Sequence, residues 1–241
     1  MVALAQSESD IKTIEKARSM YLTGPVPSSI SCGVAMDWDA LFQQLKLEQT
    51  DETKARIEKV KGLKISVVSH DADHTEVKID GDSTNQLSDG LRQQLQGFFK
   101  IFWTQSYGRL LEVKPGEHFE LTTTPEGYVM KSAKGEAKAV IDMDKSYRIT
   151  RTNFESPQMS GAGTFGFVAG EDGLFRFRNF DETLQFGENK LVVNINLDYQ
   201  KVGPYEVPQR IHMALPGSFS FDYTLKGCEV KGDSDAAPTA K

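Results

Sequence analysis

The chain has 241 residues and a formal charge of -6, from 34 acidic and 28 basic residues. An acidic chain without a basic stripe argues against nucleic acid as a partner. The hydrophobic content of 39% is that of a globular protein, and no apolar run approaches the ~20 residues of a membrane-spanning helix. The sequence therefore predicts that this is not an integral membrane protein.

The first eight residues have two interpretations. Ala3 and Ala5 form the small-x-small pattern that surrounds a signal-peptidase cut, here between Ala5 and Gln6. The alternative is a disordered start that happens to contain two alanines. Residues 1–8 are therefore interpreted as a disordered start or a signal-peptide remnant.

The N-terminal half reads mainly as helices with a few strands. Ser9 and Asp10 cap a helix that is expected to run to about Leu22, where Pro25 and Pro27 follow. A strand at 30–36, a short helical stretch at 39–47, a charged helix at 51–61 and hairpin strands at 64–69 and 75–80 come next. The strongest helix is expected from 85 to about 111, because Leu87, Leu91, Leu95, Phe98, Phe99 and Phe102 form an apolar stripe at helical spacing.

From His118 onward the sequence reads as strands. Expected strands begin near 119, 128, 137 and 147, and 157–163 is interpreted as a flexible interruption. Short Phe-rich strands at 165–167 and 175–177 precede a ladder of three long alternating strands at 191–200, 207–215 and 219–225. Strict apolar–polar alternation over such lengths is the period of half-buried antiparallel strands.

Helices followed by a long meander of strands indicate an α+β fold. A sheet of about eight to eleven strands curls strongly, so we expect an incomplete antiparallel β-barrel wrapped around plugging helices. Residues 9–231 are expected to form a single domain, and the polar residues 232–241 a disordered tail.

Two cysteines, Cys32 and Cys228, lie near opposite ends of the chain. In an exported protein such a pair suggests a disulfide, which over a loop this long contributes roughly 4–5 kcal/mol in the chain-entropy model. Two buried free thiols are the alternative. The disulfide and the signal-peptide remnant support each other.

No catalytic, metal or cofactor site stands out. His70 and His74 in the sequence His-Asp-Ala-Asp-His have a metal-like spacing, but strands flank them, so a turn is favoured. His118 and His212 are expected at the surface.

The carboxylates Asp142, Asp144, Asp181 and Glu182 lie near expected turns, where solvent and turn roles are favoured over acid–base chemistry. The sequence also contains no Gly-x-Ser-x-Gly elbow, so we expect a protein that is not an enzyme.

Two segments resemble the periplasmic lipoprotein carriers of the LolA/LolB-like superfamily. Residues 140–144 with 147–149 look like the strand–turn–strand of that fold, with an Asp at the turn. Residues 198–200, Gly203 and 207–211 look like its late hairpin, where a Pro opens the second strand. The resemblance covers residues 86–230 and implies an apolar cavity for acyl chains in the bacterial periplasm. It departs from the family in one respect, because neither Arg148 nor Arg151 matches the arginine that closes the carriers' cavity.

The sheet offers more apolar surface than the helices can cover, which predicts a cavity. Met130, Met143 and Met213 suit a tolerant lining. The expected lining residues are Phe98, Phe102, Trp103, Phe119, Leu121, Met130, Val193, Ile195, Leu197, Tyr199, Ile211, Met213, Phe219, Phe221 and Tyr223.

The first functional hypothesis is an exported, monomeric periplasmic protein that holds a lipid, an acyl chain or the lipid of a lipoprotein, with envelope proteins as further partners. A structural or protein-interaction domain with a self-filled barrel is the first alternative, and an unrecognised hydrolase is the second.

Overall fold

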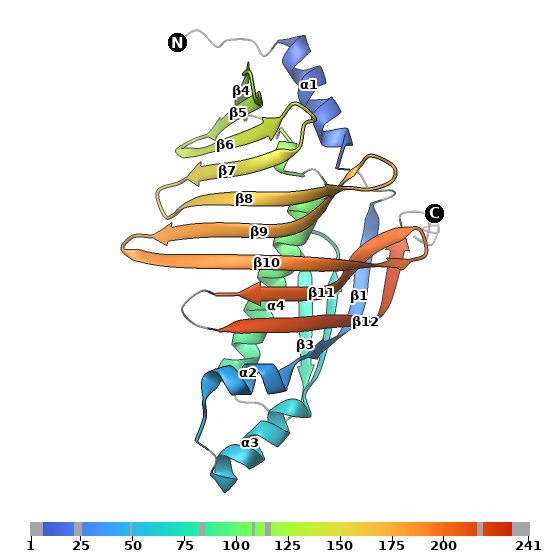
Figure 1. The fold of residues 1–241 in the computed structure, drawn as a ribbon, viewed down its shortest axis with the longest axis vertical. Coiled ribbons are helices and arrows are strands. Elements are labelled where there is room, and N and C mark those ends of the chain that lie inside the picture. The colour runs from blue at the N-terminus through green and yellow to red at the C-terminus, as the bar shows by residue number, and fades with distance from the viewer. Residues whose placement is uncertain are drawn as a thin grey trace, which may run out of the picture. The chain divides into compact units, whose positions relative to one another are not determined.

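The computed structural model describes residues 7–21, 26–48, 50–81, 85–107, 109–113, 117–215 and 219–232, with the backbone alone for residues 85 and 86. The expected signal-peptidase cut and almost all of the expected tail lie outside these ranges. The described residues form four α-helices, one 3-10 helix and twelve strands (Figure 1).

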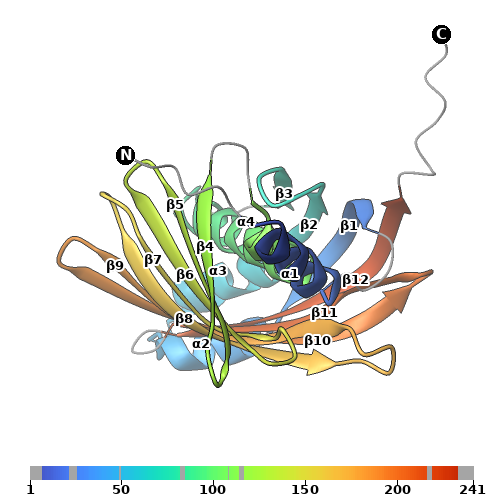
Figure 2. The same ribbon diagram turned by 90° about the horizontal axis from the view of Figure 1, so that it is seen from above.

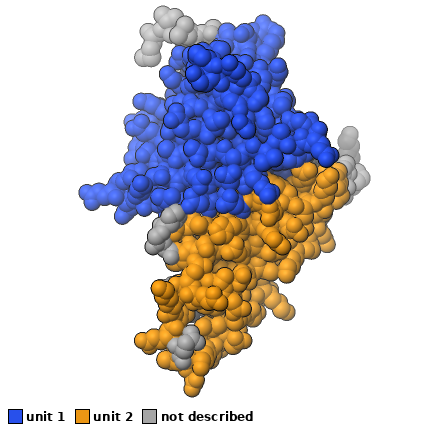
Figure 3. All heavy atoms as spheres, viewed as in Figure 1, with its two compact units in different colours: residues 1–23, 105–196 blue, residues 24–104, 197–241 orange. Residues whose placement is uncertain are grey.

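The chain forms two compact units, each built from two separate stretches of sequence (Figure 3). Unit 1 comprises residues 1–23 and 105–196, and unit 2 comprises residues 24–104 and 197–241. Unit 1 contains α1 (Glu8–Ser19), η1 (Arg109–Leu111), β4 (His118–Thr123), β5 (Gly127–Lys134), β6 (Ala137–Asp144), β7 (Ile149–Glu155), β8 (Ser160–Ala169) and β9 (Phe175–Phe186). Unit 2 contains β1 (Pro27–Met36), α2 (Trp38–Leu45), α3 (Asp51–Lys61), β2 (Lys64–Ser69), β3 (Thr75–Asp80), β11 (Tyr205–Ala214), β12 (Ser220–Gly232) and most of α4 (Asn85–Ser106). The long strand β10 (Asn189–Val202) contributes its first part to unit 1 and its last part to unit 2.

The strands follow the hydrogen-bonded order β3-β2-β1-β12-β11-β10-β9-β8-β7-β6-β5-β4. Among the described strands β3 and β4 end this order, so the antiparallel sheet is open and does not close into a barrel. The expected α+β antiparallel class is confirmed, but the expected number of about eight to eleven strands is too low. The N-terminal strands add to the C-terminal ladder because β1 pairs with β12.

Local sequence signals predict where several helices and strands begin and end. The hydroxyl of Ser7 accepts a hydrogen bond from the backbone N–H of Asp10 and begins α1, and the hydroxyl of Thr50 accepts one from Thr53 and begins α3. The bounds of α3, β2 and β3 are those expected from the sequence. The helix α4 ends earlier than expected, at Ser106, and η1 follows it.

The expected interruption at 157–163 is too long. Residues 157–159 do lie between strands, but β8 begins at Ser160 and pairs with both β7 and β9. A Cβ atom on Gly161 would lie 2.3 Å from the ring of Phe154 and 3.0 Å from the side chain of Leu184. This glycine therefore does not break the strand. It makes room for neighbouring side chains that lie across the backbone.

Tyr21, just after α1, joins the N-terminal segment to the sheet of unit 1. Its hydroxyl accepts a hydrogen bond from the Ile149 N–H at 2.5 Å and donates one to the Tyr147 carbonyl at 2.8 Å. Its ring contacts Phe167 and Phe175, with centroids 5.0 and 5.4 Å away. Burial raises the pKa of the Tyr21 hydroxyl, so it stays protonated and keeps both bonds.

Cys32 on β1 and Cys228 on β12 form a disulfide between two neighbouring antiparallel strands of unit 2. The bond closes a loop with a sequence separation of 196 residues. Of the two interpretations that the sequence allowed, the disulfide is confirmed.

Candidate ligand-binding site

The apolar face of unit 2 is covered by its own helix. Figure 1 shows α4 crossing β11 and β12. The indole Nε1 of Trp103 donates to the hydroxyl of Ser69 at 2.7 Å, and the hydroxyl of Tyr223 donates to the side-chain oxygen of Gln94 at 2.6 Å. The stripe that predicted α4 is buried in the structure, through Leu91, Leu95, Phe98, Phe99 and Phe102.

Ten of the fifteen expected lining residues belong to unit 2. Most of them are buried, namely Phe98, Phe102, Trp103, Leu197, Ile211, Met213, Phe221 and Tyr223. Tyr199 and Phe219 are half-buried, and the Tyr199 ring lies 6.5 Å from that of Phe102. The structure brings these residues together as a packed core in which α4 occupies the space next to the sheet.

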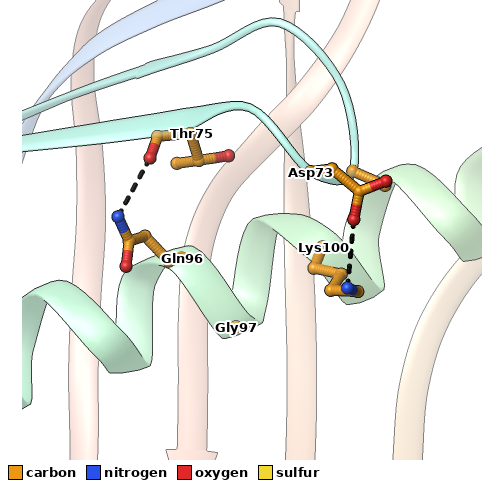
Figure 4. A pocket seen from close by; sticks show the side chains of 6 residues that line it. Asp73, Thr75, Gln96, Gly97 and Lys100 are labelled. Carbon is orange, nitrogen blue, oxygen red and sulfur yellow. Dashed lines mark hydrogen bonds and ion pairs between the residues drawn. The ribbon is translucent and has the colours of Figure 1, made fainter.

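A hollow of about 270 Å³ lies at the surface of unit 2, between the β2–β3 turn and α4 (Figure 4). Lys100 reaches Asp73 at 3.0 Å, and the side-chain amide of Gln96 donates to the Thr75 carbonyl at 3.1 Å. These polar contacts tie the hairpin to the helix. The hollow lacks the apolar lining expected of a lipid site.

The sheet of unit 1 presents a different apolar face. We call it the inner face, because α1 lies against it (Figure 2). Residues opposite one another on neighbouring antiparallel strands share a face, so the register defines rows of side chains across the sheet. The open row is Phe119, Ser132, Ala139, Phe154, Gly161, Leu184 and Leu191. The covered row beside it is Leu121, Met130, Ile141, Thr152, Gly163, Glu182 and Val193.

The two rows differ in how far they are covered. Met130, Ile141, Thr152 and Gly163 at the centre of the covered row are buried. Every residue of the open row is half-buried except Leu191, which is 39% exposed. The open row is therefore a strip of accessible apolar surface on the inner face.

The remaining expected lining residues lie in these rows or next to them. Phe119 is in the open row, and Leu121, Met130 and Val193 are in the covered row. Phe119, Leu121 and Val193 are half-buried, whereas Met130 and Ile195 are buried. The predicted lining thus includes both ends of the covered row and the Phe119 end of the open row, but it lacks Phe154, Leu184 and Leu191 of the open row.

A small pocket lies at the β4 end of the open row. Its volume is about 230 Å³, and its lining comprises Ile11, Ile14, Glu15, Arg18, Leu111, Val113 and Phe119. Pockets for small molecules occupy roughly 300–1,000 Å³, so this pocket alone holds only part of such a ligand. Since Phe119 belongs to both, the pocket is continuous with the open row, and its lining adds the charged side chains of Glu15 and Arg18 to apolar ones.

Glu182 is the only ionisable residue in the two rows. It lies within β9 on the inner face, between Gly163 on β8 and Val193 on β10. Its carboxyl has no hydrogen bond or ion pair with any described residue, and burial raises its pKa to about 7. The expectation that Glu182 belongs to a turn is therefore wrong. Asp144 does belong to a turn, where its carboxylate accepts from the N–H groups of Ser146 and Arg148.

The outer face of unit 1 is polar, as the alternation predicts. Arg151 pairs there with Asp142 at 2.7 Å, and Asn194 donates to Asp181 across β9 and β10. Arg148 pairs with Asp144 at 3.0 Å. Both arginines are thus engaged in local ion pairs and do not line the open row.

The histidines occupy surface positions. His70, His74 and His118 are exposed, and His212 is half-exposed and 2.8 Å from Asp222 on the neighbouring strand. The carboxylate of Asp71 accepts from the N–H groups of Asp73 and His74, which confirms the turn interpretation of 70–74. Proximity to Asp71 raises the pKa of His74.

Comparisons with known proteins leave the chain without an assigned family. No family model, no curated protein and no solved structure matches it. Within the described residues, none of the helices combines the length and apolar character needed to cross a bilayer.

Proposed function

We propose that the protein binds a lipid or another ligand with an acyl chain, and that the chain lies along the open row of unit 1. The observation that carries this proposal is the contrast between the two units. The face of unit 2 is filled by α4, whereas the open row stays accessible from Phe119 to Leu191. Each methylene buried there contributes about 0.8 kcal/mol to binding.

The proposal also covers the class of protein and the cellular compartment in which it works. We propose an exported protein, because the disulfide between Cys32 and Cys228 suits an oxidising compartment, and we propose the bacterial envelope because of the two resembling segments. A LolA/LolB-like carrier of lipoprotein lipids is the class that the two resembling segments favour. Because Arg148 is paired with Asp144, we expect this protein to release its ligand by a mechanism that does not use an arginine to close the cavity.

A second candidate function is a structural or protein-interaction domain. The buried α4 stripe favours it, because α4 covers the apolar face of unit 2 and Phe98 and Phe102 are buried in its core. On this alternative the open row is a contact surface for another protein.

Thr183 and Leu184 provide a matched test. They are neighbours on β9, both half-buried, and alternation places Leu184 in the open row on the inner face and Thr183 on the outer face. Binding of dodecanol, read from displacement of the fluorescent probe N-phenyl-1-naphthylamine, is measured for the wild type and for Leu184→Gln. An amide placed against the alkyl chain should weaken binding about tenfold.

Thr183→Gln is the control, since it introduces the same side chain on the same strand and should leave binding unchanged. Native mass spectrometry of protein from its original host provides an independent test, in which a co-purified lipid supports the proposal. A clean apo mass together with no binding of the probe or of dodecanol would refute lipid binding and favour the interaction domain.

A further inference from the structure

We propose that Glu182 selects the ligand's head group, so that the open row takes an amphiphile with one alkyl chain and a primary ammonium group. This inference rests on lipid binding in unit 1 and specifies the chemical class of the ligand. It assigns to Glu182 the role of a polar anchor at one end of the apolar strip.

The geometry places the carboxyl beside the strip. Glu182 is two residues from Leu184 on β9, so both side chains lie on the inner face and Glu182 directly adjoins the open row. Gly163 opposite it has no side chain, and a Cβ there would lie 2.9 Å from the ring of Phe180. The carboxyl is therefore flanked by apolar groups and by bare backbone, with nothing in the described chain to neutralise it.

Charge complementarity favours an ammonium group. Neither row contains a lysine or an arginine, and the full chain carries a formal charge of -6. The half-buried carboxylate is only partly hydrated and has no counter-ion among the described residues. An ammonium group supplies a charge and hydrogen-bond donors at once. A fatty acid would instead place a second carboxylate close to Glu182, which is unfavourable.

The strip is long enough for the alkyl chain. From Glu182 on β9 to Phe119 on β4, steps of ~4.8 Å between strands give a span of about 24 Å. One leaflet of a bilayer provides about 15 Å for an acyl chain, half of its hydrocarbon core. A head group at Glu182 therefore leaves room for the chain along the open row, with the pocket beside Phe119 at its far end.

The test compares dodecylamine, dodecanol and dodecanoate as competitors for a bound fluorescent probe, N-phenyl-1-naphthylamine. The proteins are the wild type, Glu182→Gln and Asp181→Asn, the last being the neighbouring acid on the outer face. For the wild type at about pH 8 the amine should bind about tenfold more tightly than the alcohol, and the acid less tightly than either. Glu182→Gln should remove the preference for the amine, and Asp181→Asn should keep it.

Two results would overturn the inference. One excludes head-group selection alone, and the other also excludes lipid binding. If all three competitors displace the probe equally, or if Glu182→Gln keeps the preference for the amine, head-group selection is wrong and lipid binding stands. If neither the probe nor any competitor binds the wild type, lipid binding itself is wrong and the inference fails with it.

Discussion

Replacing Glu182 by glutamine should stabilise the protein in the absence of ligand, and only at neutral to alkaline pH. The side chain keeps its shape in Glu182→Gln, so packing against Val193 and Phe180 is retained. What changes is the charge that the wild type must hold on the apolar inner face. Burial raises the pKa of this carboxyl from 4.5 to about 7 in the folded protein.

The pKa difference sets the size of the effect. A shift of one pKa unit corresponds to 1.36 kcal/mol, so a rise from 4.5 to about 7 has an upper bound of about 3 kcal/mol. The side chain is only half-buried, and solvent screens the charge, which reduces the expected effect to ~1–2 kcal/mol.

The sign follows from proton linkage. The folded state holds the proton more tightly than the unfolded state, so the wild type is most stable below about pH 4.5 and loses stability as the pH rises through about 7. Glu182→Gln lacks this loss. The two proteins should have similar unfolding free energies near pH 4, and the variant should be more stable by ~1–2 kcal/mol near pH 8.

Urea unfolding followed by circular dichroism provides the measurement. Tryptophan fluorescence is less suitable, because Trp38 and Trp103 both lie in unit 2. Asp181→Asn on the outer face is the control and should not gain stability at alkaline pH. A constant difference between Glu182→Gln and the wild type from about pH 4 to pH 8 would show that the carboxyl is solvated like an ordinary surface glutamate.

Four further changes test other parts of the fold. Tyr21→Phe removes both hydrogen bonds of the hydroxyl and leaves the Ile149 N–H without its partner, so the unfolding free energy should fall by about 1–3 kcal/mol in urea; an unchanged value would mean that water replaces the hydroxyl. Gly161→Ala should cost about 1–3 kcal/mol, because its methyl group collides with the ring of Phe154. Gly97→Ala in α4 meets no atom within 4 Å and should instead stabilise by about 0.4–1 kcal/mol, which makes it a control for glycine replacement. Reducing the disulfide, or replacing both cysteines by serine, should lower the thermal midpoint and cost about 2–5 kcal/mol; an unchanged midpoint would mean that unit 2 does not depend on the bond.

The sequence predicts helices and turns well where the residues that determine them are neighbours in the chain. The charged pattern of residues 51–61 predicts α3, and the Asp-rich turn at 70–74 predicts the hairpin. The prediction fails at Gly161 and Gly163, which have the composition of a loop. Their role depends on Phe154 and Phe180, whose rings lie across them from neighbouring strands, and this cannot be read from the local sequence.

The candidate site is predictable only in part. Alternation correctly separates the inner residue Val193 from the outer residue Asn194, but it does not indicate which part of the apolar face α4 covers. That division depends on where the helix packs against the sheet, which is a tertiary property. A signal for Glu182 was present, because Phe180, Glu182 and Leu184 alternate with polar residues and thus place a carboxyl on an apolar face.

The bond between Cys32 and Cys228 also constrains the order of events during biosynthesis. A ribosome adds roughly 5–20 residues per second, so the separation of 196 residues corresponds to about 10–40 s between the emergence of the two thiols. In the folded protein β1 pairs with β2 and β12, and during this interval only β2 of these two partners has been made. The disulfide of unit 2 can therefore form only after Cys228 has emerged, and the oxidant that completes it has to act after that point.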